Sequence, residues 1–335
     1  MKRTFSILLL ILVPVLLATL AMFIGPSGEG GWESVLEWIR WKTGSPADAG
    51  THPELTGLIL WEIRFPRIML AFLTGGALSL AGVAMQAIFR NPLASPYILG
   101  MSSGAAFGAA LALAWGFMPP QASAFLFAAL ATFLCYLIAV RKKKLAVLHL
   151  VLGGIIVSGI FTALLTLVQY LSDPFKLQTI VHWTMGNLHN ANNTKLWTSL
   201  IPAGIGVAGI LIFRWRLNLL SLGDQEARSS GMNVPVQRGL IILLATLATS
   251  GAIAVSGIIG FIDLIVPHMV RMVTGADHRK LAPVSFVAGG CLLLVIDTLS
   301  RILGSYEIPA GVITMLIGAP VFIFILKRSK IVWGT

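Results

Sequence analysis

Charged side chains that lie inside apolar stretches, or at their ends, are the first candidates for a chemical or binding function in this sequence. The sequence WEIRFPR runs directly into a long apolar stretch, so Arg64 and Arg67 stand at its beginning. Asp263 in GFIDLIVPH and Asp297 in LLLVIDTLSR lie within apolar stretches, and Arg301 follows Asp297 by one helical turn. A charge in apolar surroundings costs at least ~2.5 kcal/mol unless it faces protein, water or a partner. These five residues are therefore candidates for structural ion pairs or for function.

Sequence spacing suggests partners for the two aspartates. The i to i+4 spacing of Asp297 and Arg301 predicts an ion pair on one helix. Asp263 has His268 and Arg271 nearby, but neither spacing brings the side chains together within one helical turn. Proton relay through Asp263 is an alternative that needs a chain of further titratable groups, which the sequence does not show.

Motifs for catalysis or for a bound metal are missing from the sequence. It contains no G-x-x-x-x-G-K-[ST], no H-E-x-x-H and no cysteine pair at metal-binding spacing. Cys135 and Cys291 each lie in the middle of an apolar stretch, where a buried apolar role is expected. We therefore expect no resident metal or cofactor and no enzymatic activity. If ATP drives this protein, another chain must hydrolyse it.

The elements that position these residues are membrane spans. The chain is 56% apolar and 11% charged, with a mean hydropathy of +0.87, far from the range of soluble domains. At about 20 residues per span, we predict an all-α, polytopic membrane protein of about ten helices. The first segment could be mistaken for a cleaved signal peptide, but its length is nearer a full span. The predicted spans are 5–24, 68–89, 97–115, 120–140, 145–171, 196–213, 239–259, 260–274, 281–300 and 308–326.

The distribution of basic residues predicts the orientation. With ten spans, 17 of the 24 Lys and Arg residues lie on the side of the two termini, so the positive-inside rule makes both termini cytoplasmic. The net charge of +11 is then a signal of topology rather than of nucleic-acid binding. Arg64, Arg67 and Arg301 fall on the exterior side, where snorkelling at the interface is an alternative to a function. The exterior sequence WESVLEWIRW predicts a short helix lying at the interface.

An internal repeat predicts a transporter architecture. The sequence GALSLAG at 76–82 matches GAIAVSG at 251–257, with an offset of 175 residues. The same offset relates two further pairs, Pro92 with Pro267 and Gly100 with Gly275. The two copies are five spans apart, an odd number, so they run in opposite directions, as in the inverted repeats of many transporters. We predict one permease domain over 1–335, with a first repeat at about 60–171 and a second at about 239–326.

Four stretches of the sequence resemble a known family. They are RFPRIMLAFLTGGALSLAGVAMQAIFRNPLASPYILGMSSGAAFG, LGDQEARSSGMNV, GFIDLIVPHMVRMVTGADHRKLAP and IPAGVITMLIGAPVFIFIL. In this order, from about residue 60 to 326, they are similar to the membrane-spanning subunit of ABC importers for iron–siderophore complexes, haem and cobalamin. The resemblance implies a multi-pass permease in the cytoplasmic membrane of a bacterium or archaeon. It also implies three kinds of partner: a second copy of the chain, two cytoplasmic ATP-binding subunits and an exterior substrate-binding protein.

The resemblance also implies roles for particular residues. Arg64, Arg67 and Arg301 match exterior arginines that pair with glutamates of the binding protein, and exposed guanidinium groups would suit that contact. Asn91 and Leu93 match the cytoplasmic gate. The loop 214–238 resembles two short helices that press on the ATPase, broken at Gly231 and contributing Leu222, Gly223, Asp224, Glu226, Ala227 and Arg228. Asp263 departs from the family, which usually has a small residue there.

Two other classes of function remain open at this point. An ion-coupled secondary transporter would also show inverted repeats, but it needs its own coupling-ion site, for which only Asp263 is a free candidate. A membrane-embedded enzyme needs a convergent set of catalytic groups, and none is apparent. Within the family that the sequence resembles, the alternative cargo is an oxyanion such as molybdate, and the apolar spans do not choose between the substrates.

Overall fold

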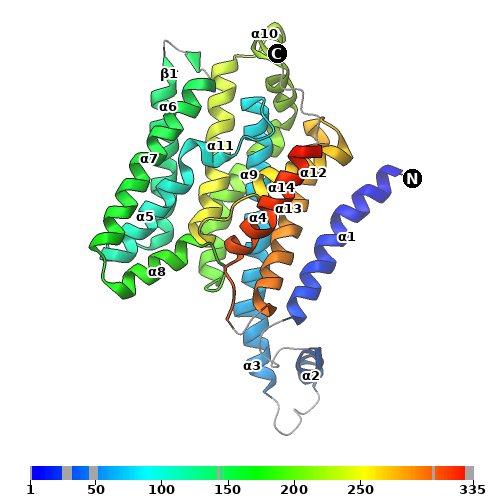
Figure 1. Ribbon diagram of the computed structural model, residues 1–335. Coiled ribbons are helices and arrows are strands. Elements are labelled where there is room, and N and C mark those ends of the chain that lie inside the picture. The colour runs from blue at the N-terminus through cyan, green and yellow to red at the C-terminus, as the bar shows by residue number, and fades with distance from the viewer. Residues whose placement is uncertain are drawn as a thin grey trace.

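The structure, a computed structural model, is a bundle of helices (Figure 1). It describes residues 2–24, 32–44, 52–141, 144–145, 147–303 and 306–328. In these ranges the helices are α1 (Lys2–Phe23), α2 (Trp32–Lys42), α3 (Pro53–Leu58), α4 (Phe65–Phe89), α5 (Met101–Trp115), α6 (Pro120–Ala139), α7 (Val147–Leu171), α8 (Pro174–Thr184), α9 (Asn193–Leu222), α10 (Asp224–Ser229), α11 (Val234–Ser256), α12 (Ile262–Thr274), α13 (His278–Ile302) and α14 (Ala310–Arg328). Two short strands, β1 (Val140–Arg141) and β2 (Lys144–Leu145), pair antiparallel. The predicted all-α class is confirmed.

Each predicted span contains one helix, and the matching helices are α1, α4, α5, α6, α7, α9, α11, α12, α13 and α14. In the described part of the chain, six helices are long and apolar enough to cross a membrane. Helix α12 has 13 residues, about 20 Å at 1.5 Å per residue, which is shorter than the hydrocarbon core. It follows a non-helical stretch at 257–261. The predicted spans 239–259 and 260–274 are therefore corrected: α11 ends at Ser256, the chain is then non-helical for a few residues, and the short helix α12 follows.

Helix α4 occupies the centre of the bundle. It packs against α9, α11, α12 and α13, while α5, α6 and α7 pack against one another, and α5 and α6 join them to α11 (Figure 1). Small residues permit this density, because a Cβ added at Gly75 would overlap the backbone of Gly289, and one added at Gly82 would overlap the carbonyl group of Asp263. Close backbone contact of this kind holds helices together where the hydrophobic effect between them is weak.

The helix that carries Arg64 and Arg67 begins much earlier than the predicted span. Helix α3 continues through a π-helical turn, η1 (Ile59–Arg64), into α4, so residues 53–89 form one helical rod of 37 residues. π-helical turns are rare in proteins, and those that occur are often found at functional sites. The arginines therefore project from the wall of a continuous helix rather than from a loop at its end.

The two ends of the bundle carry different features. One end, the α10 end, has α10 and the loop after α4, and the other, the α8 end, has α2, α3 and α8 (Figure 1). Helix α4 runs towards the α10 end and α11 runs away from it, as an inverted repeat requires. The repeat itself stays a prediction. The short interfacial helix predicted from WESVLEWIRW is present as α2.

The predicted loop at 214–238 is mostly helical. Helix α9 continues to Leu222, α10 follows after Gly223, and α11 begins at Val234. The expectation of two short helices is wrong for this region, since α10 is the one short helix between α9 and α11 and the chain after Gly231 enters α11 directly.

Candidate functional site

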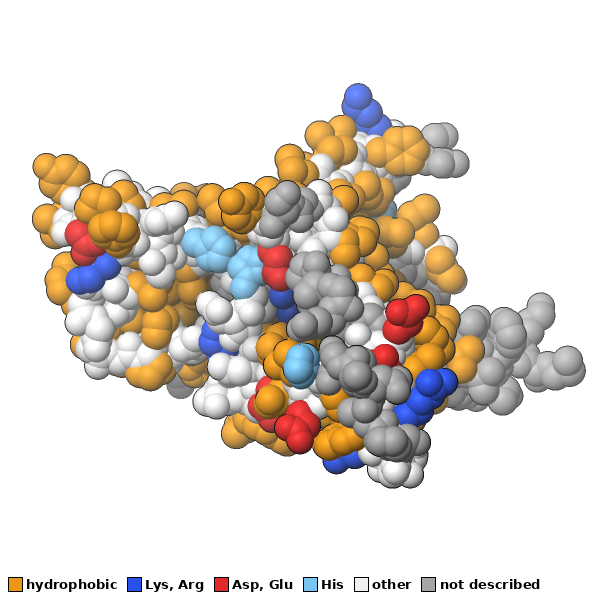
Figure 2. Space-filling view, turned by 90° about the horizontal axis from the view of Figure 1, so that it is seen from below, with side chains coloured by type: hydrophobic (Ala, Val, Ile, Leu, Met, Phe, Trp, Pro, Cys, Tyr) orange, Lys and Arg blue, Asp and Glu red, His pale blue; other side chains and the backbone are white. Residues whose placement is uncertain are grey.

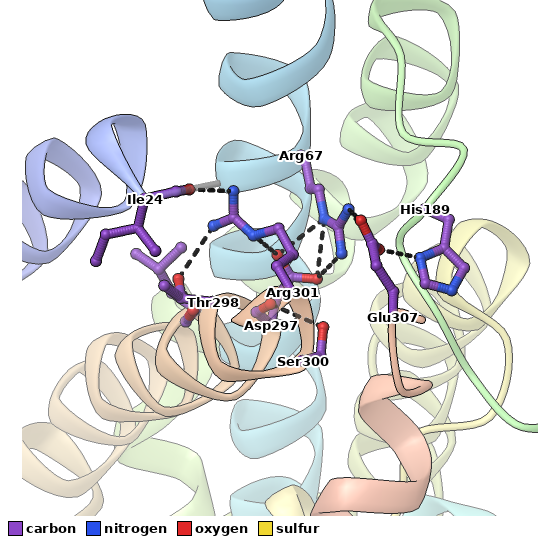
Figure 3. Close-up of polar contacts among 9 residues, drawn as sticks. Ile24, Arg67, His189, Asp297, Thr298, Ser300, Arg301 and Glu307 are labelled. Atoms are coloured by element: carbon purple, nitrogen blue, oxygen red, sulfur yellow. Dashed lines mark hydrogen bonds and ion pairs between the residues drawn. The ribbon is translucent and has the colours of Figure 1, made fainter. Parts of the chain in front are cut away.

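A network of charged side chains at the α8 end joins segments far apart in sequence (Figure 3). Arg67 of α4 donates from Nε to the two carboxylate oxygens of Asp297 at 3.1 and 3.0 Å, and from Nη2 at 3.0 Å. Its Nη1 lies 2.9 Å from Oε2 of Glu307, which precedes α14. Glu307 also forms a short contact with Nδ1 of His189. Together with Arg301 we call these residues the α8-end network.

Asp297 is held chiefly by a residue that the sequence did not suggest. Arg301 is within ion-pair distance, with Nε 3.7 Å from Oδ2 of Asp297, so the predicted pair exists. Arg67 makes the shorter and multiple contacts although it lies 230 positions away. Since Asp297 has no exposed surface, these two arginines supply the positive charge that its burial requires.

The three arginines predicted to be exposed are buried. Arg64, Arg67 and Arg301 are 4%, 5% and 3% exposed. Arg64 donates to the carbonyl oxygen of Met22 at 2.5 Å, and Arg301 donates to that of Ile24 at 3.1 Å. The expectation of exposed guanidinium groups is therefore wrong, because carbonyl groups at the end of α1 accept from Arg64 and Arg301, and Arg67 is paired with Asp297 and Glu307. Their role in docking stays a prediction.

His189 of this network forms a stacked pair with a second histidine, His182. The His182 and His189 rings stack with centroids 5.3 Å apart and planes at 19°. Burial and the neighbouring His189 lower the pKa of His182. Burial alone would raise the pKa of Glu307, but the hydrogen bond with His189 and the charge of Arg67 lower it to about 2. Figure 2, which views the α8 end, shows neighbouring histidines beside an acidic side chain at the surface.

Sequence reasoning missed His182, His189 and Glu307 as site residues. The signal was present, since HWTMGNLHN places two histidines in a predicted exterior loop and Glu307 is the acid just before the last apolar segment. The loop is partly helix α8 and partly an extended stretch that packs on the bundle, where Asn187 N donates to the carbonyl oxygen of Ser256 at 2.7 Å. This packing carries His189 to Glu307.

At the α10 end, Asp224 connects three helices. Its carboxylate accepts from Arg238 of α11 at 2.6 and 3.1 Å and lies 3.5 Å from Arg90, which ends α4 in the left-handed conformation. Arg238 is buried and also donates to the carbonyl oxygen of Leu145 at 3.3 Å. Helix α10 is thus tied by its first residue to the ends of α4 and α11.

The other predicted coupling residues divide between surface and turn positions. Leu222 is 66% exposed, although it is a large apolar side chain. Glu226 and Arg228 are also exposed, whereas Ala227 is buried. Gly223 and Gly231 have φ values of 149° and 78°, which a side chain would disfavour, and they set the direction of the chain before and after α10. Residues 222–231, which we call the coupling segment, therefore present an exposed face held by a rigid base.

The predicted gate residues form a tight turn after α4. The side-chain oxygen of Asn91 accepts a hydrogen bond from Leu93 N at 2.9 Å, and its backbone oxygen accepts from Ala94 N at 3.1 Å. Leu93 is half-buried. The turn leads to Ser95, whose hydroxyl accepts from Tyr97 N at 3.1 Å and caps the short 3₁₀ helix η2 (Pro96–Leu99). A structural turn role for Asn91 is therefore present, and the gating role stays a prediction.

Asp263 contacts the turn at 91–95, which we call the gate turn, rather than its sequence neighbours His268 and Arg271. It is buried at the first turn of α12, and its carboxylate accepts a short hydrogen bond from the Ser95 hydroxyl. Tyr97 donates to the carbonyl oxygen of Ile259 at 2.8 Å in the stretch before α12. Gln86 of α4 accepts from Arg271 at 2.9 Å. The gate turn, the end of α4 and α12 therefore share one polar contact region.

Metal chemistry finds no support in the described residues. Within them, no group of three or more His, Cys, Asp or Glu side chains is arranged to hold a metal ion. Cys135 is buried and its Sγ contacts the carbonyl oxygen of Leu150 at 3.2 Å, in agreement with a packing role.

Comparisons with known proteins agree with this arrangement. The model of the FecCD transport family matches residues 7–328. The chain is 40% identical to the molybdate import system permease protein MolB of Haemophilus influenzae, over 81% of this chain and 82% of that one. It is 38% identical to an iron chelatin transport system permease protein of Helicobacter pylori, over 83% of this chain and 86% of that one. A solved structure of a metal-chelate type ABC transporter in an inward-facing conformation superposes with a TM-score of 0.84 at 36% identity, over 98% of this chain and 99% of that one.

Proposed function

Because the chain belongs to the FecCD transport family of ABC importer permeases, we propose that it moves an iron chelate or a related metal-containing ligand across the cytoplasmic membrane. Siderophore complexes, haem and cobalamin are the ligands of this class. The observation that carries the proposal is the match along nearly the whole chain in both sequence and fold. The chain is a transport subunit and not an enzyme, and ATP hydrolysis belongs to separate chains.

The proposed complex has a second copy of the chain, two ATP-binding subunits and a substrate-binding protein. The α10 end is the cytoplasmic end in this proposal. The positive-inside rule supports it, since Arg90, Arg214, Arg216 and Arg228 belong to segments at that end. Both termini are then cytoplasmic. The ATP-binding subunits dock on the coupling segment, whose exposed Leu222 and Glu226 offer an apolar and a charged contact.

Coupling follows a short route through the structure. An ATPase that displaces α10 pulls on Asp224, and Asp224 is paired with Arg90 at the end of α4. Arg90 directly precedes Asn91, and the same turn is fastened to α12 through the hydrogen bond from Ser95 to Asp263. A movement at the coupling segment therefore reaches the gate turn over a few side chains. Alternating access needs such a connection between the ATPase and the gate.

Docking of the binding protein at the α8 end uses an exchange of carboxylates. The guanidinium of Arg67 is already paired, with Asp297 on one side and Glu307 on the other. Asp297 has no exposed surface, whereas the Glu307 side chain is 26% exposed and can move away. A glutamate of the binding protein replaces Glu307 on Arg67, and this releases the segment that leads into α14. Arg64 and Arg301 keep the site positive and steer the encounter.

Molybdate remains the second candidate for the cargo. The observation in its favour is the 40% identity to a permease named for molybdate import. Specificity in this proposal lies largely in the binding protein, so the decisive measurement is the affinity of the cognate binding protein for ferric siderophores, haem, cobalamin and molybdate. Tight binding of molybdate, with no binding of the metal-containing ligands, would replace the iron-chelate assignment.

Proteoliposomes test the proposed transport directly. The permease is reconstituted with its ATP-binding subunits, its binding protein and internal ATP, and uptake of radiolabelled ligand is measured. Uptake should stop when ATP is omitted and should not respond to a proton or sodium gradient. Uptake driven by an ion gradient without the ATP-binding subunits would instead support a secondary transporter.

The coupling route has its own matched test. Asp224→Asn removes the charge that pairs with Arg90 and Arg238. We expect the complex to assemble and hydrolyse ATP, with uptake per ATP reduced about fivefold or more. Asp173→Asn at the start of α8 is the control, because Asn also caps a helix and this site is at the other end. Equal transport by the two variants would contradict the route through Asp224.

The proposed exchange of carboxylates on Arg67 predicts that a substitution of Glu307 raises the affinity for the binding protein. Glu307→Gln removes the internal competitor for Arg67 but leaves Asp297 in place, so the binding protein should dock more tightly, and more so at low salt. Glu54→Gln, at an exposed position of α3, is the control. Surface plasmon resonance at two ionic strengths measures the change. Unchanged or weaker docking of Glu307→Gln would refute the exchange.

A further inference from the structure

An open cavity lies between α6, α9 and α11 at the α8 end. Its volume is about 610 Å³. The wall is mainly apolar and is built from the first turns of α6 and α9 and the last turns of α11. The lining residues that matter below are Ala122, Leu126, Lys195, Thr198, Pro202 and Gly251. None of the polar networks described above uses this cavity.

Exposed aromatic side chains place the mouth of the cavity at the membrane interface. Trp115 and Phe117 precede α6 and are 55% and 51% exposed, and Trp197 in the first turns of α9 is 61% exposed. Tryptophan is enriched where hydrocarbon meets the head groups. Lys195 lies in the same turn as Trp197, so its ammonium group is at head-group level. The cavity continues along α6 to Leu126 and along α9 to Pro202, which is the depth of the acyl chains.

Lys195 is a half-buried cation, and in the part of the chain that the structure describes its ammonium group has no hydrogen bond or ion pair. It lines the apolar cavity and also a smaller neighbour of about 150 Å³. About half of the wall of the smaller cavity is polar, with side chains of Gln121, Thr179, His182, Asn187 and Asn190. A partly desolvated ammonium group is stabilised by an anion, and amide and hydroxyl groups suit a ligand with hydroxyls.

We propose that these two cavities form a binding site for an anionic phospholipid of the outer leaflet. One acyl chain fills the apolar cavity, the phosphate accepts hydrogen bonds from Lys195, and a hydroxyl-bearing head group occupies the polar cavity. The combination of an apolar cavity at chain depth and one cation at head-group level matches this class of molecule. The volume is within the range of small-molecule sites.

A lipid fits the site better than a protein helix does, because a phospholipid carries its own anion. A helix from a second copy of the chain would have to bring a carboxylate to Lys195. The lipid site joins α6 of the first repeat to α9 and α11, so its occupancy stabilises the packing between these helices. The inference does not depend on which ligand is transported.

Native mass spectrometry of the purified permease tests the site, with 1-palmitoyl-2-oleoyl-phosphatidylglycerol and the matching phosphatidylcholine as probes. We expect the wild type to retain the anionic lipid about tenfold more tightly than the zwitterionic one. Lys195→Ala should remove this preference. Lys176→Ala should keep it, because Lys176 donates to the carbonyl oxygen of Ala114 and pairs with Asp173 instead. Equal retention of the two lipids by the wild type would overturn the proposal.

A second variant separates the lipid site from general effects on folding. Ala122 is exposed in the cavity wall, so Ala122→Phe fills space without displacing the core. This variant should lose retention of the anionic lipid while its thermal unfolding in neutral detergent stays near that of the wild type. Occupation by a second copy has its own outcome, since Leu126→Cys would then crosslink to itself under oxidation. Crosslinking at Leu126, or lipid retention by Ala122→Phe, would reject the lipid assignment.

Discussion

Removal of the charge of Asp297 should destabilise the protein strongly, because two buried arginines, Arg67 and Arg301, are paired with it. In Asp297→Asn, Arg67 keeps Glu307 at 2.9 Å, but the two charged oxygens at 3.0 to 3.1 Å are replaced by one neutral acceptor and an NH2 group, and Arg301 loses its carboxylate at 3.7 Å. Removal of one partner from a buried ion pair costs about 3–5 kcal/mol. Since Glu307 still balances part of the charge, we expect about 3 kcal/mol, at the lower end of this range.

Equilibrium unfolding by titration of sodium dodecyl sulfate into mixed micelles measures this loss. Asp173→Asn is the matched control, because it makes the same substitution at an exposed helix cap where Asn also serves. The double variant Asp297→Asn/Arg301→Met should be less destabilised than the sum of its single variants, since it removes an arginine that the first change left unpaired. A cost below about 1 kcal/mol for Asp297→Asn would refute the assignment of Asp297 as the centre of the α8-end network.

Three further predictions address the other polar and packing contacts. The pKa of Glu307 is about 2, below its ordinary 4.5, so its ion pairs contribute fully above that ordinary value and are lost as the pH falls towards the lower one. This contribution should be about 1–2 kcal/mol after solvent screening, and stability between pH 5 and pH 2 should fall less steeply in Glu307→Gln than in the wild type. Leu93→Cys should form a disulfide-linked homodimer when the cytoplasmic side is closed and should crosslink less during ATP turnover; an intact dimer that never crosslinks would place Leu93 away from the twofold axis. Gly82→Ala should cost about 1–3 kcal/mol in the same unfolding assay because its Cβ overlaps the carbonyl group of Asp263, whereas Gly204→Ala, whose Cβ meets nothing within 4 Å, should cost little.

Hydropathy predicted the helices well because the composition of each apolar run is enough to indicate a membrane helix, without knowledge of the other helices. All ten predicted spans contain a helix, and the amphipathic WESVLEWIRW forms α2. Boundaries were less accurate where a helix leaves the membrane without stopping. Helix α9 continues to Leu222, and α4 is extended back to Pro53 through α3 and η1. Helix formation is a local property of the backbone, whereas hydropathy reports the depth of burial in lipid.

Charge partners were predicted only where they share a helix. The pair of Asp297 and Arg301 follows from the i to i+4 spacing, and the structure contains it. The closer partner, Arg67, depends on how α4 packs against α13, which no local pattern encodes. Arg64 and Arg301 were expected at the surface, but the carbonyl oxygens of Met22 and Ile24 at the end of α1 accept from them.

By itself, the sequence determined the all-α membrane class, the approximate spans and the family, since these depend on composition, on period and on ordered motifs. Only the tertiary structure decided which polar groups meet. The Ser95 hydroxyl reaches Asp263 across 168 positions, and Asp224 bridges Arg90 and Arg238. In a bundle with few charges, each buried polar group needs a partner, but the partner comes from whichever helix packs beside it. That choice depends on the close approach of α4 to α12 and α13 at glycines such as Gly75 and Gly82, which becomes visible only when the helices are assembled.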